Sequence, residues 1–505
     1  MANGQTPQAP AAANHPVAHF PKQAIVVVHG MGEQMPMDTI KGFVHAAWET
    51  VTDLTANGLP DPAEVWSKPD VRTGSLELRR ITTRQSIPTT TFPDRVRSDF
   101  YELYWADLSG GSTLSQVEDW IAGLLLRNPF NRVPRDVLLA WIVLWLIALA
   151  IIAFAVATVL PDEAKIGPFN LWDLPLLNWL HGAARWKLGL ATAALSFVAS
   201  SFIVPYFGRV VRYTRAKPEN IAAREAIRKR GLDLLTELHS GDYTRIIVVG
   251  HSLGAILAYD LISYFWARRQ EPRTLAESSK DEFEALRRLE QAIADLDAQA
   301  TPSEPAIAAY LKAQTDFGRL LRLREKPKGE DPDPRWLITD FVTLGSPLSH
   351  AEFLMAKSKD DLQKRQQDRE YPTSPPLREL LDPKYGPDAK KAGLPLAGTP
   401  HRLLAFPFSA GKWQLHHACP FAVTRWTNIY DPARLVAFGD LISGPAAPVF
   451  GAGIVDVNLR ELRGQSWRFT HTRYWAMPGD SKKPVPEHIL QLRKALDLGG
   501  QHRQL

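Results

Sequence analysis

The stretch that decides the fold runs from residue 245 to residue 265 and reads RIIVV GHSLG AILAYDLISYF. Its first five residues have the β-branched character of a buried strand, and its last eleven read as an apolar helix. The five residues between them place Ser252 in a tight turn, with Gly250 and Gly254 on either side. Glycines are needed there because the strand and helix backbones approach closely and a Cβ would clash. The sequence therefore predicts a nucleophile elbow that presents the Ser252 hydroxyl.

A second buried strand, residues 24–28 (AIVVV), runs into the glycine turn HGMGEQ. This turn resembles the HG-containing oxyanion loop of lipases and esterases, in which backbone N–H groups point at the negative charge of an acyl-transfer transition state. The resemblance implies one donor at Leu253, directly after the nucleophile, and the other at Met31 or Gly32. Two further residues of the turn are interpreted as structural: Gly30 and His29.

The motifs HGMG and GHSLG make the chain similar to the serine hydrolases of the α/β-hydrolase superfamily. The segment TLGSPL at residues 343–348 looks like the TLGSP segment of lipase-like hydrolases, where Ser346 would be a loop residue and not a second nucleophile. The resemblance implies a Ser-His-Asp triad in the chain order nucleophile, acid, histidine, with no cofactor and no metal. The acid and the histidine are therefore expected after Ser252.

Two aspartates are candidates for the acid. Asp440 lies in a loop that ends SGP and looks like the DxxSGP segment of lipase-like relatives. Asp431 immediately precedes Pro432, which is the arrangement of a helix N-cap. We favour Asp440 and keep Asp431 as the alternative acid.

Three histidines follow Asp440. His471 lies between a strand candidate, residues 454–459, and the amphipathic run PEHILQLRKAL, which is where the resemblance places the catalytic histidine. His488 lies within that run and is expected to face solvent or pack on the core, and His502 lies in the tail. His471 is therefore the predicted general base.

The chain alternates short β-branched runs with helical stretches, which is typical of an α/β protein with a mostly parallel sheet. The fold class is accordingly α/β, an α/β-hydrolase fold with flanking helices, interrupted by a transmembrane hairpin and a helical insertion. The predicted parts are a flexible tail (1–22), three pieces of the hydrolase domain (23–126, 218–270 and 336–498), the hairpin with its basic flanks (127–217), the insertion (271–335) and a second tail (499–505).

The transmembrane hairpin is predicted from two uncharged runs. Residues 137–160 hold 24 residues without a charge, enough for a helix to cross a bilayer with some tilt, and residues 188–208 are about the minimum spanning length. A pair of buried core helices is the alternative. Seven basic residues flank the hairpin and three lie in its loop, so the positive-inside rule places both flanks in the cytoplasm. The sequence thus predicts an integral membrane protein, with the bilayer as a partner.

The helical insertion begins with a capping-box pattern, Ser279 and Glu282, ahead of apolar residues at helical spacing. A second helix is expected over residues 305–323, before the charged, proline-rich stretch 324–335. The insertion is interpreted as a lid, a hairpin that binds a protein partner, or a solvated decoration.

Composition excludes several classes. A formal charge of +5 without a Lys/Arg-rich block does not suggest nucleic-acid binding. The single cysteine, Cys419, permits no internal disulfide. His416 and His417 are adjacent and would point apart on a strand, and no further ligands have matching spacing, so no metal is expected.

The predicted function is a membrane-anchored serine hydrolase that cleaves carboxylic esters of lipid or lipid-like substrates. In this mechanism His471 takes the proton of Ser252 and Asp440 holds the imidazole. A thioesterase or peptidase would use the same triad. A non-catalytic membrane scaffold on a hydrolase fold is the alternative from another class.

Overall fold

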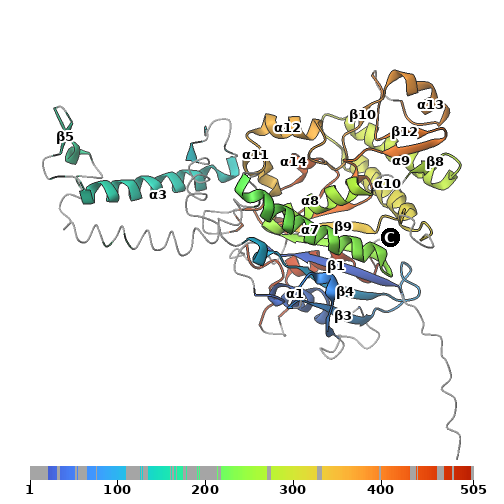
Figure 1. The fold of residues 1–505 in the computed structure, drawn as a ribbon, viewed down its shortest axis with the longest axis horizontal. Coiled ribbons are helices and arrows are strands. Elements are labelled where there is room, and N and C mark those ends of the chain that lie inside the picture. Colours follow the sequence, from blue (N-terminus) through green and yellow to red (C-terminus); the bar gives the residue numbers. More distant parts are fainter. Residues whose placement is uncertain are drawn as a thin grey trace, which may run out of the picture.

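A single eight-stranded sheet forms the centre of the protein, whose computed structural model is drawn in Figure 1. The strands lie in the order β15 (Val455–Asn458), β14 (Arg425–Tyr430), β9 (Ile338–Leu344), β7 (Tyr243–His251), β1 (Lys22–Val28), β4 (Arg97–Leu103), β3 (Arg79–Gln85) and β2 (Trp66–Pro69). The structure describes residues 21–30, 35–51, 54, 65–75, 77–109, 135–159, 218–269, 274–326, 333–396, 400–432, 439–440, 442–462, 471–479 and 483–501, with short pieces between 125 and 213.

Five neighbouring pairs, from β15 to β4, are parallel, and only the pairs that involve β3 are antiparallel within this sheet. The predicted α/β class with a mostly parallel sheet is therefore confirmed. The sequence predicts strands over residues 24–28, 100–104, 245–249, 337–344, 425–430 and 454–459, and each range overlaps one of the six parallel strands from β15 to β4. It missed β2, which is exposed, and β3, which has arginines near both ends.

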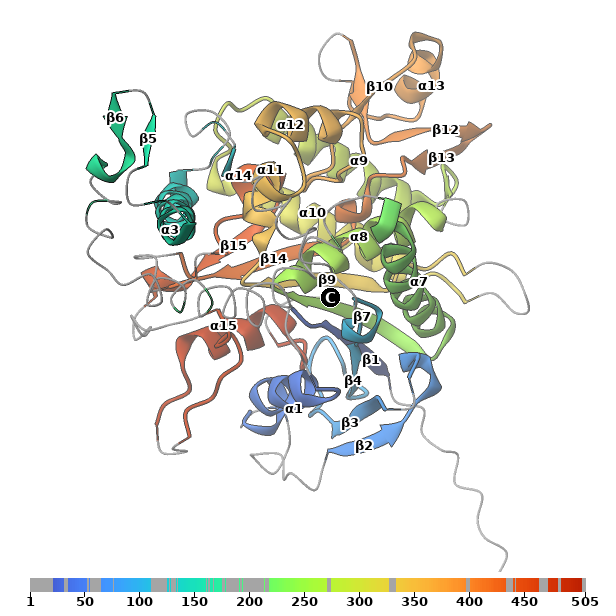
Figure 2. The ribbon, with the colours of Figure 1, turned by 60° about the vertical axis from the view of Figure 1, so that its left-hand side comes forward.

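Side chains of β1 alternate between two hydrophobic cores, as the pleat of a strand requires. Val26 and Val28 face a core built with α7 (Pro218–Ser240) and α8 (Leu253–Arg268). Ile25 and Val27 face the opposite core, built with α1 (Asp38–Val44) and α15 (Glu487–Leu496). The sheet is thus covered on both faces, as the two views show (Figures 1 and 2).

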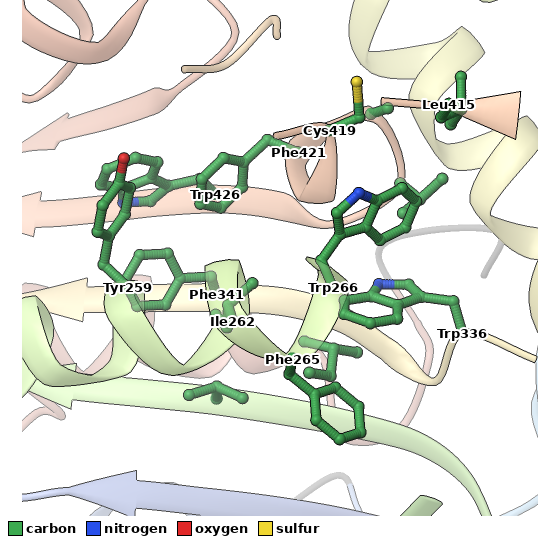
Figure 3. Packing of buried hydrophobic residues seen from close by; sticks show 14 of the residues in the cluster. Tyr259, Ile262, Phe265, Trp266, Trp336, Phe341, Leu415, Cys419, Phe421 and Trp426 are labelled. Atoms are coloured by element: carbon green, nitrogen blue, oxygen red, sulfur yellow. The ribbon is translucent and has the colours of Figure 1, made fainter. Parts of the chain in front are cut away.

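Aromatic side chains fill the first core between α8 and the sheet (Figure 3). Tyr259 and Trp266 extend from α8, while Phe341 of β9 and Trp426 of β14 lie across from them. The ring centroids of Phe341 and Trp426 are 5.0 Å apart, and those of Tyr259 and Trp426 are 5.7 Å apart. Each such pair adds to the stabilisation from burial alone, so this cluster fixes α8, and with it the turn before α8, on the sheet.

The insertion forms the two helices that the sequence predicted, α9 (Lys280–Asp297) and α10 (Glu304–Arg322). The capping box is not formed, because the Ser279 side chain makes no cap hydrogen bond and Glu282 pairs with Arg324 at 2.7 Å. Tyr310 and Gln314 of α10 are buried and donate to the carbonyl of Phe421 at 2.7 and 2.6 Å. The insertion therefore contributes to the core, which a solvated decoration would not do.

The first uncharged run does form a helix, α3 (Arg135–Val159), which extends away from the sheet in Figure 1. No helix within the described part of the chain combines the length and apolarity that a membrane span requires. This finding contradicts the transmembrane hairpin and the integral-membrane location that were predicted from the sequence.

An uncharged run predicts a helix but does not identify what surrounds it, because lipid and protein both accept apolar side chains. Trp145 of α3 donates from Nε1 to the carbonyl of Leu125 at 2.9 Å, and Ala157 is buried, so parts of α3 contact protein. Several other side chains of α3 are outside the described residues, and so is nearly all of the second run, in which only Leu190 and Ala193 are described.

Candidate active site

Ser252 occupies the turn between β7 and α8, with φ 54° and ψ −131°. A positive φ is uncommon for a residue with a side chain and costs free energy, so the surrounding structure must hold it. The N–H of Ser252 donates to Leu344 at 3.0 Å, and its carbonyl accepts from Ala255 at 2.9 Å. These bonds fix the strained turn that the sequence predicted as a nucleophile elbow.

Three glycines let the chain pass close to this turn. A Cβ on Gly250 would clash with the backbone of Ala255, and one on Gly254 would clash with the carbonyl oxygens of Val28 and His29. A Cβ on Gly30 would lie 2.7 Å from the Cβ of Ser252. The two motifs are therefore in direct contact, and the missing side chains are what allows it.

His471 and Asp440 are paired. Nδ1 of His471 lies 2.9 Å from Oδ2 of Asp440, which is a hydrogen bond from the imidazole to the carboxylate. Asp440 is 1% exposed, while His471 is partly buried. This bond places the ring with Nε2 unprotonated when the imidazole is neutral, which is the state a general base needs.

Asp440 receives two further hydrogen bonds. The hydroxyl of Tyr474 donates to Oδ2 at 2.8 Å, and the N–H of Ile442 donates to Oδ1 at 3.0 Å. Burial raises the pKa of Asp440, but the hydrogen bond and charge of His471, together with Tyr474, outweigh burial and leave the pKa below its ordinary value. Asp440 is therefore held as a carboxylate.

Asp431, the alternative acid, is also fully buried at the end of β14. Its carbonyl accepts from the N–H of Asp440 at 3.0 Å, and its own N–H donates to the Tyr474 hydroxyl at 3.3 Å. The geometry thus pairs Asp440, and not Asp431, with His471. The helix that Asp431 was predicted to cap would begin at residues 433–438, which lie outside the described residues.

His251, the last residue of β7 and the residue before Ser252, contacts His471. Nε2 of His251 lies 3.0 Å from the carbonyl of His471, and the two rings stack with centroids 4.9 Å apart. Burial, with the charge of His471, lowers the pKa of His251 to about 3, so His251 stays neutral and donates this bond. His251 therefore joins the strand before the nucleophile to the loop that carries the predicted base.

Two polar atoms at the centre of the site are buried and have no hydrogen-bond partner: Oγ of Ser252 and Nε2 of His471. Buried polar atoms are normally satisfied, so unpaired ones require an explanation. A nucleophile and its base often form their bond only when substrate closes the site. An unpaired serine hydroxyl and an unpaired imidazole nitrogen in one site fit such a resting state.

The predicted oxyanion hole is described in part. Leu253 is the first residue of α8, and the first N–H groups of a helix have no partner within the helix. Met31 and Gly32, the candidates for the second donor, lie outside the described residues.

Three other histidines that the sequence singled out have structural partners, and His502 lies outside the described residues. His29 is buried, donates from Nδ1 to the Gly30 carbonyl at 2.8 Å and accepts at Nε2 from the N–H of Trp105 at 3.2 Å. His416 contacts the Leu377 carbonyl at 2.9 Å and His488 the Ala476 carbonyl at 3.2 Å. Among the described residues no group of histidine, cysteine and acidic side chains is suited to a metal ion.

Sequence reasoning missed three residues of the site: Tyr474, His251 and Gly345. A Cβ on Gly345 would lie 2.8 Å from Oδ2 of Asp440 and 3.1 Å from Nδ1 of His471, so this glycine makes room for the pair. Tyr474 follows His471 by three residues, and this short spacing is the only feature of the sequence that could have indicated a role for Tyr474 in the site. The contacts of His251 and Gly345 depend on the folded chain and leave no pattern in the sequence.

Comparison with family models, with curated proteins and with solved structures gives no match for this chain.

Proposed function

We propose that the protein is a serine hydrolase of the α/β-hydrolase class that cleaves carboxylic esters through an acyl-enzyme. The observation that carries the proposal is a serine in a strained strand-to-helix turn, together with a buried histidine–aspartate pair at the same edge of the sheet. The mostly parallel sheet supports this class, because the turns after its parallel strands converge there.

In the proposed reaction the Ser252 hydroxyl attacks the ester carbonyl and passes its proton to Nε2 of His471. The carbonyl oxygen becomes an oxyanion, which in this proposal accepts a hydrogen bond from the Leu253 N–H. The imidazolium returns the proton to the leaving alcohol, and the acyl group stays on Ser252. Water, activated by the same imidazole, then releases the acid and restores the serine.

Asp440 stabilises the imidazolium that forms in each step and keeps the ring in the required tautomer. Its low pKa suits this role, because a carboxylate that stays ionised can offset the positive charge on His471. The membrane hairpin was the reason to expect a lipid substrate, and without the hairpin no described residue favours lipids over other esters. The proposal is therefore limited to carboxylic esters as a class.

A fluorophosphonate probe tests the proposal, because it modifies only an activated serine. The wild-type chain should be labelled and should hydrolyse a short-chain p-nitrophenyl ester, and Ser252→Ala should lose both properties while remaining folded. Ser263→Ala is the matched control, because Ser263 lies on α8, the helix that begins after Ser252, and donates its hydroxyl to the Tyr259 carbonyl at 2.8 Å. An unlabelled wild type would favour the scaffold alternative, and a faster reaction with thioesters would favour a thioesterase.

A further inference from the structure

A cleft of about 630 Å³ lies at the end of the sheet opposite to Ser252. Thr244, near the start of β7, lines the cleft, whereas Ser252 directly follows the end of β7. At roughly 3.3 Å per residue, the length of this strand separates the cleft from the nucleophile by about 26 Å. The cleft is therefore distinct from the candidate active site.

Four arginines line the cleft, and no carboxylate is among the described residues around it. The arginines are Arg319, Arg322, Arg324 and Arg335. Two of them are already paired outside the cleft lining, Arg324 with Glu282 and Arg335 with Asp333, each at 2.7 Å. These pairs hold two guanidinium groups in fixed positions at the wall.

Arg319 and Arg322 lie on α10 three residues apart and so share one face of the helix. Neither forms an ion pair within the described part of the chain, and Nε of Arg322 is buried without a hydrogen-bond partner. Buried charges in proteins are normally paired, so an unpaired guanidinium is a cost that a bound anion would remove.

Arg322 lies near a second positive charge, that of Arg245. Burial, with the charge of Arg245, lowers the pKa of Arg322 to about 10. The carboxylate of Asp340 is close, but it is paired with Arg245 at 2.6 Å. Arg322 therefore remains positively charged at neutral pH in a place where the fold supplies too little negative charge.

We propose that this cleft binds a small organic phosphate. Guanidinium groups bind phosphate oxygens through two parallel hydrogen bonds, and the hydroxyl of Thr90, which also lines the cleft, adds a donor of suitable chemistry. Phe92 and Leu323 supply an apolar part of the wall for the organic moiety. The volume lies within the range of small-molecule pockets, which favours a metabolite over a macromolecule.

Titration calorimetry of the full chain with inorganic pyrophosphate, and with ADP as an organic phosphate, tests the proposal. We expect saturable binding of both to the wild type, and binding weaker by about tenfold or more in Arg319→Gln/Arg322→Gln. The matched control is Arg288→Gln/Lys312→Gln, which removes two cations from α9 and α10 outside the cleft. Its affinity should stay within about twofold of the wild-type value.

Several outcomes would overturn the proposal. The proposal is wrong if neither pyrophosphate nor ADP shows saturable binding. It is also wrong if both double variants lose affinity equally. Binding of an oligonucleotide or a phosphopeptide, but of neither small phosphate, would also reject it. The thermal midpoint of each variant controls for folding, and Arg319→Gln alone, at an exposed position, repeats the test if the double variant unfolds. Because none of these measurements uses ester hydrolysis, the result is independent of the proposed function.

Discussion

Nδ1 of His471 lies 2.9 Å from Oδ2 of Asp440, although 31 residues separate them along the chain. The Tyr474 hydroxyl binds the same oxygen at 2.8 Å, so one carboxylate oxygen receives two donors from a single short loop. In the proposed mechanism Asp440 is therefore the acid that orients His471, and Tyr474 is a positioning residue for that acid.

Exchange of each aspartate for asparagine separates the two candidates for the acid. Asp440→Asn should lower kcat for an ester by about 10⁴, because the amide favours the wrong tautomer of His471. Asp431→Asn should lower kcat by less than about tenfold, because Asp431 contacts Asp440 and Tyr474 through its backbone, which the substitution leaves in place. Steady-state kinetics of both variants provide the measurement, and the reverse ranking would assign the acid role to Asp431.

Tyr474→Phe removes one donor from the Asp440 carboxylate and leaves the ring in place. With less of its charge satisfied, Asp440 should attract the imidazolium of His471 more strongly, so the acidic limb of the pH–rate profile should move to higher pH. We expect kcat to fall by about tenfold, since a hydrogen bond to an ion has been lost. An unchanged pH profile together with lower thermal stability would limit Tyr474 to a structural role.

Gly30→Ala tests the contact between the two glycine motifs. The added methyl would lie 2.7 Å from the Cβ of Ser252 and 3.1 Å from Nδ1 of His251, so one of the turns must move. A shift of this size should lower kcat/KM by about 100-fold. Gly386→Ala, where nothing lies within 4 Å of the new methyl, should leave kcat/KM unchanged. Equal kinetics for the two variants would show that the turns do not depend on this contact.

Glu290 predicts a pH dependence of stability. It is fully buried on α9, where Oε1 accepts from the N–H groups of Leu404 and Ala405 at 2.7 and 3.0 Å, and burial raises its pKa to about 7. The folded state holds the proton of the Glu290 carboxyl more tightly than the unfolded chain does. Glu290 therefore contributes most to the free energy of unfolding below about pH 4.5, and this contribution is lost as the pH rises to about 7.

Glu290→Gln should flatten this part of the stability curve. Between pH 4.5 and 7, the free energy of unfolding of the wild type should fall relative to that of the variant by up to about 3 kcal/mol. Denaturant titrations of both proteins across this range give the difference directly. A constant difference would mean that Glu290 is ionised in the folded protein throughout the range.

The sequence by itself determined the pieces of this protein that depend on local pattern. Short runs that contain β-branched or aromatic residues located the six parallel strands from β15 to β4. Glycine spacing located the turn of Ser252, because a tight turn between strand and helix restricts which residues can occupy it. Helical periodicity likewise located α9 and α10. The exposed edge strand β2 and its neighbour β3, which has arginines near both ends, carry no such pattern, and the sequence did not reveal them.

Only the tertiary structure decided which of these pieces meet. The bond from His471 to Asp440, the contact of Gly30 with Ser252 and the place of Tyr474 arise from the parallel register, which brings the ends of distant strands to one edge. The environment of an apolar helix is equally non-local, and for that reason the uncharged runs were misread as a membrane hairpin. The sequence pattern shows which side chains of a segment are apolar enough to be buried. Tertiary packing decides which other residues cover those side chains.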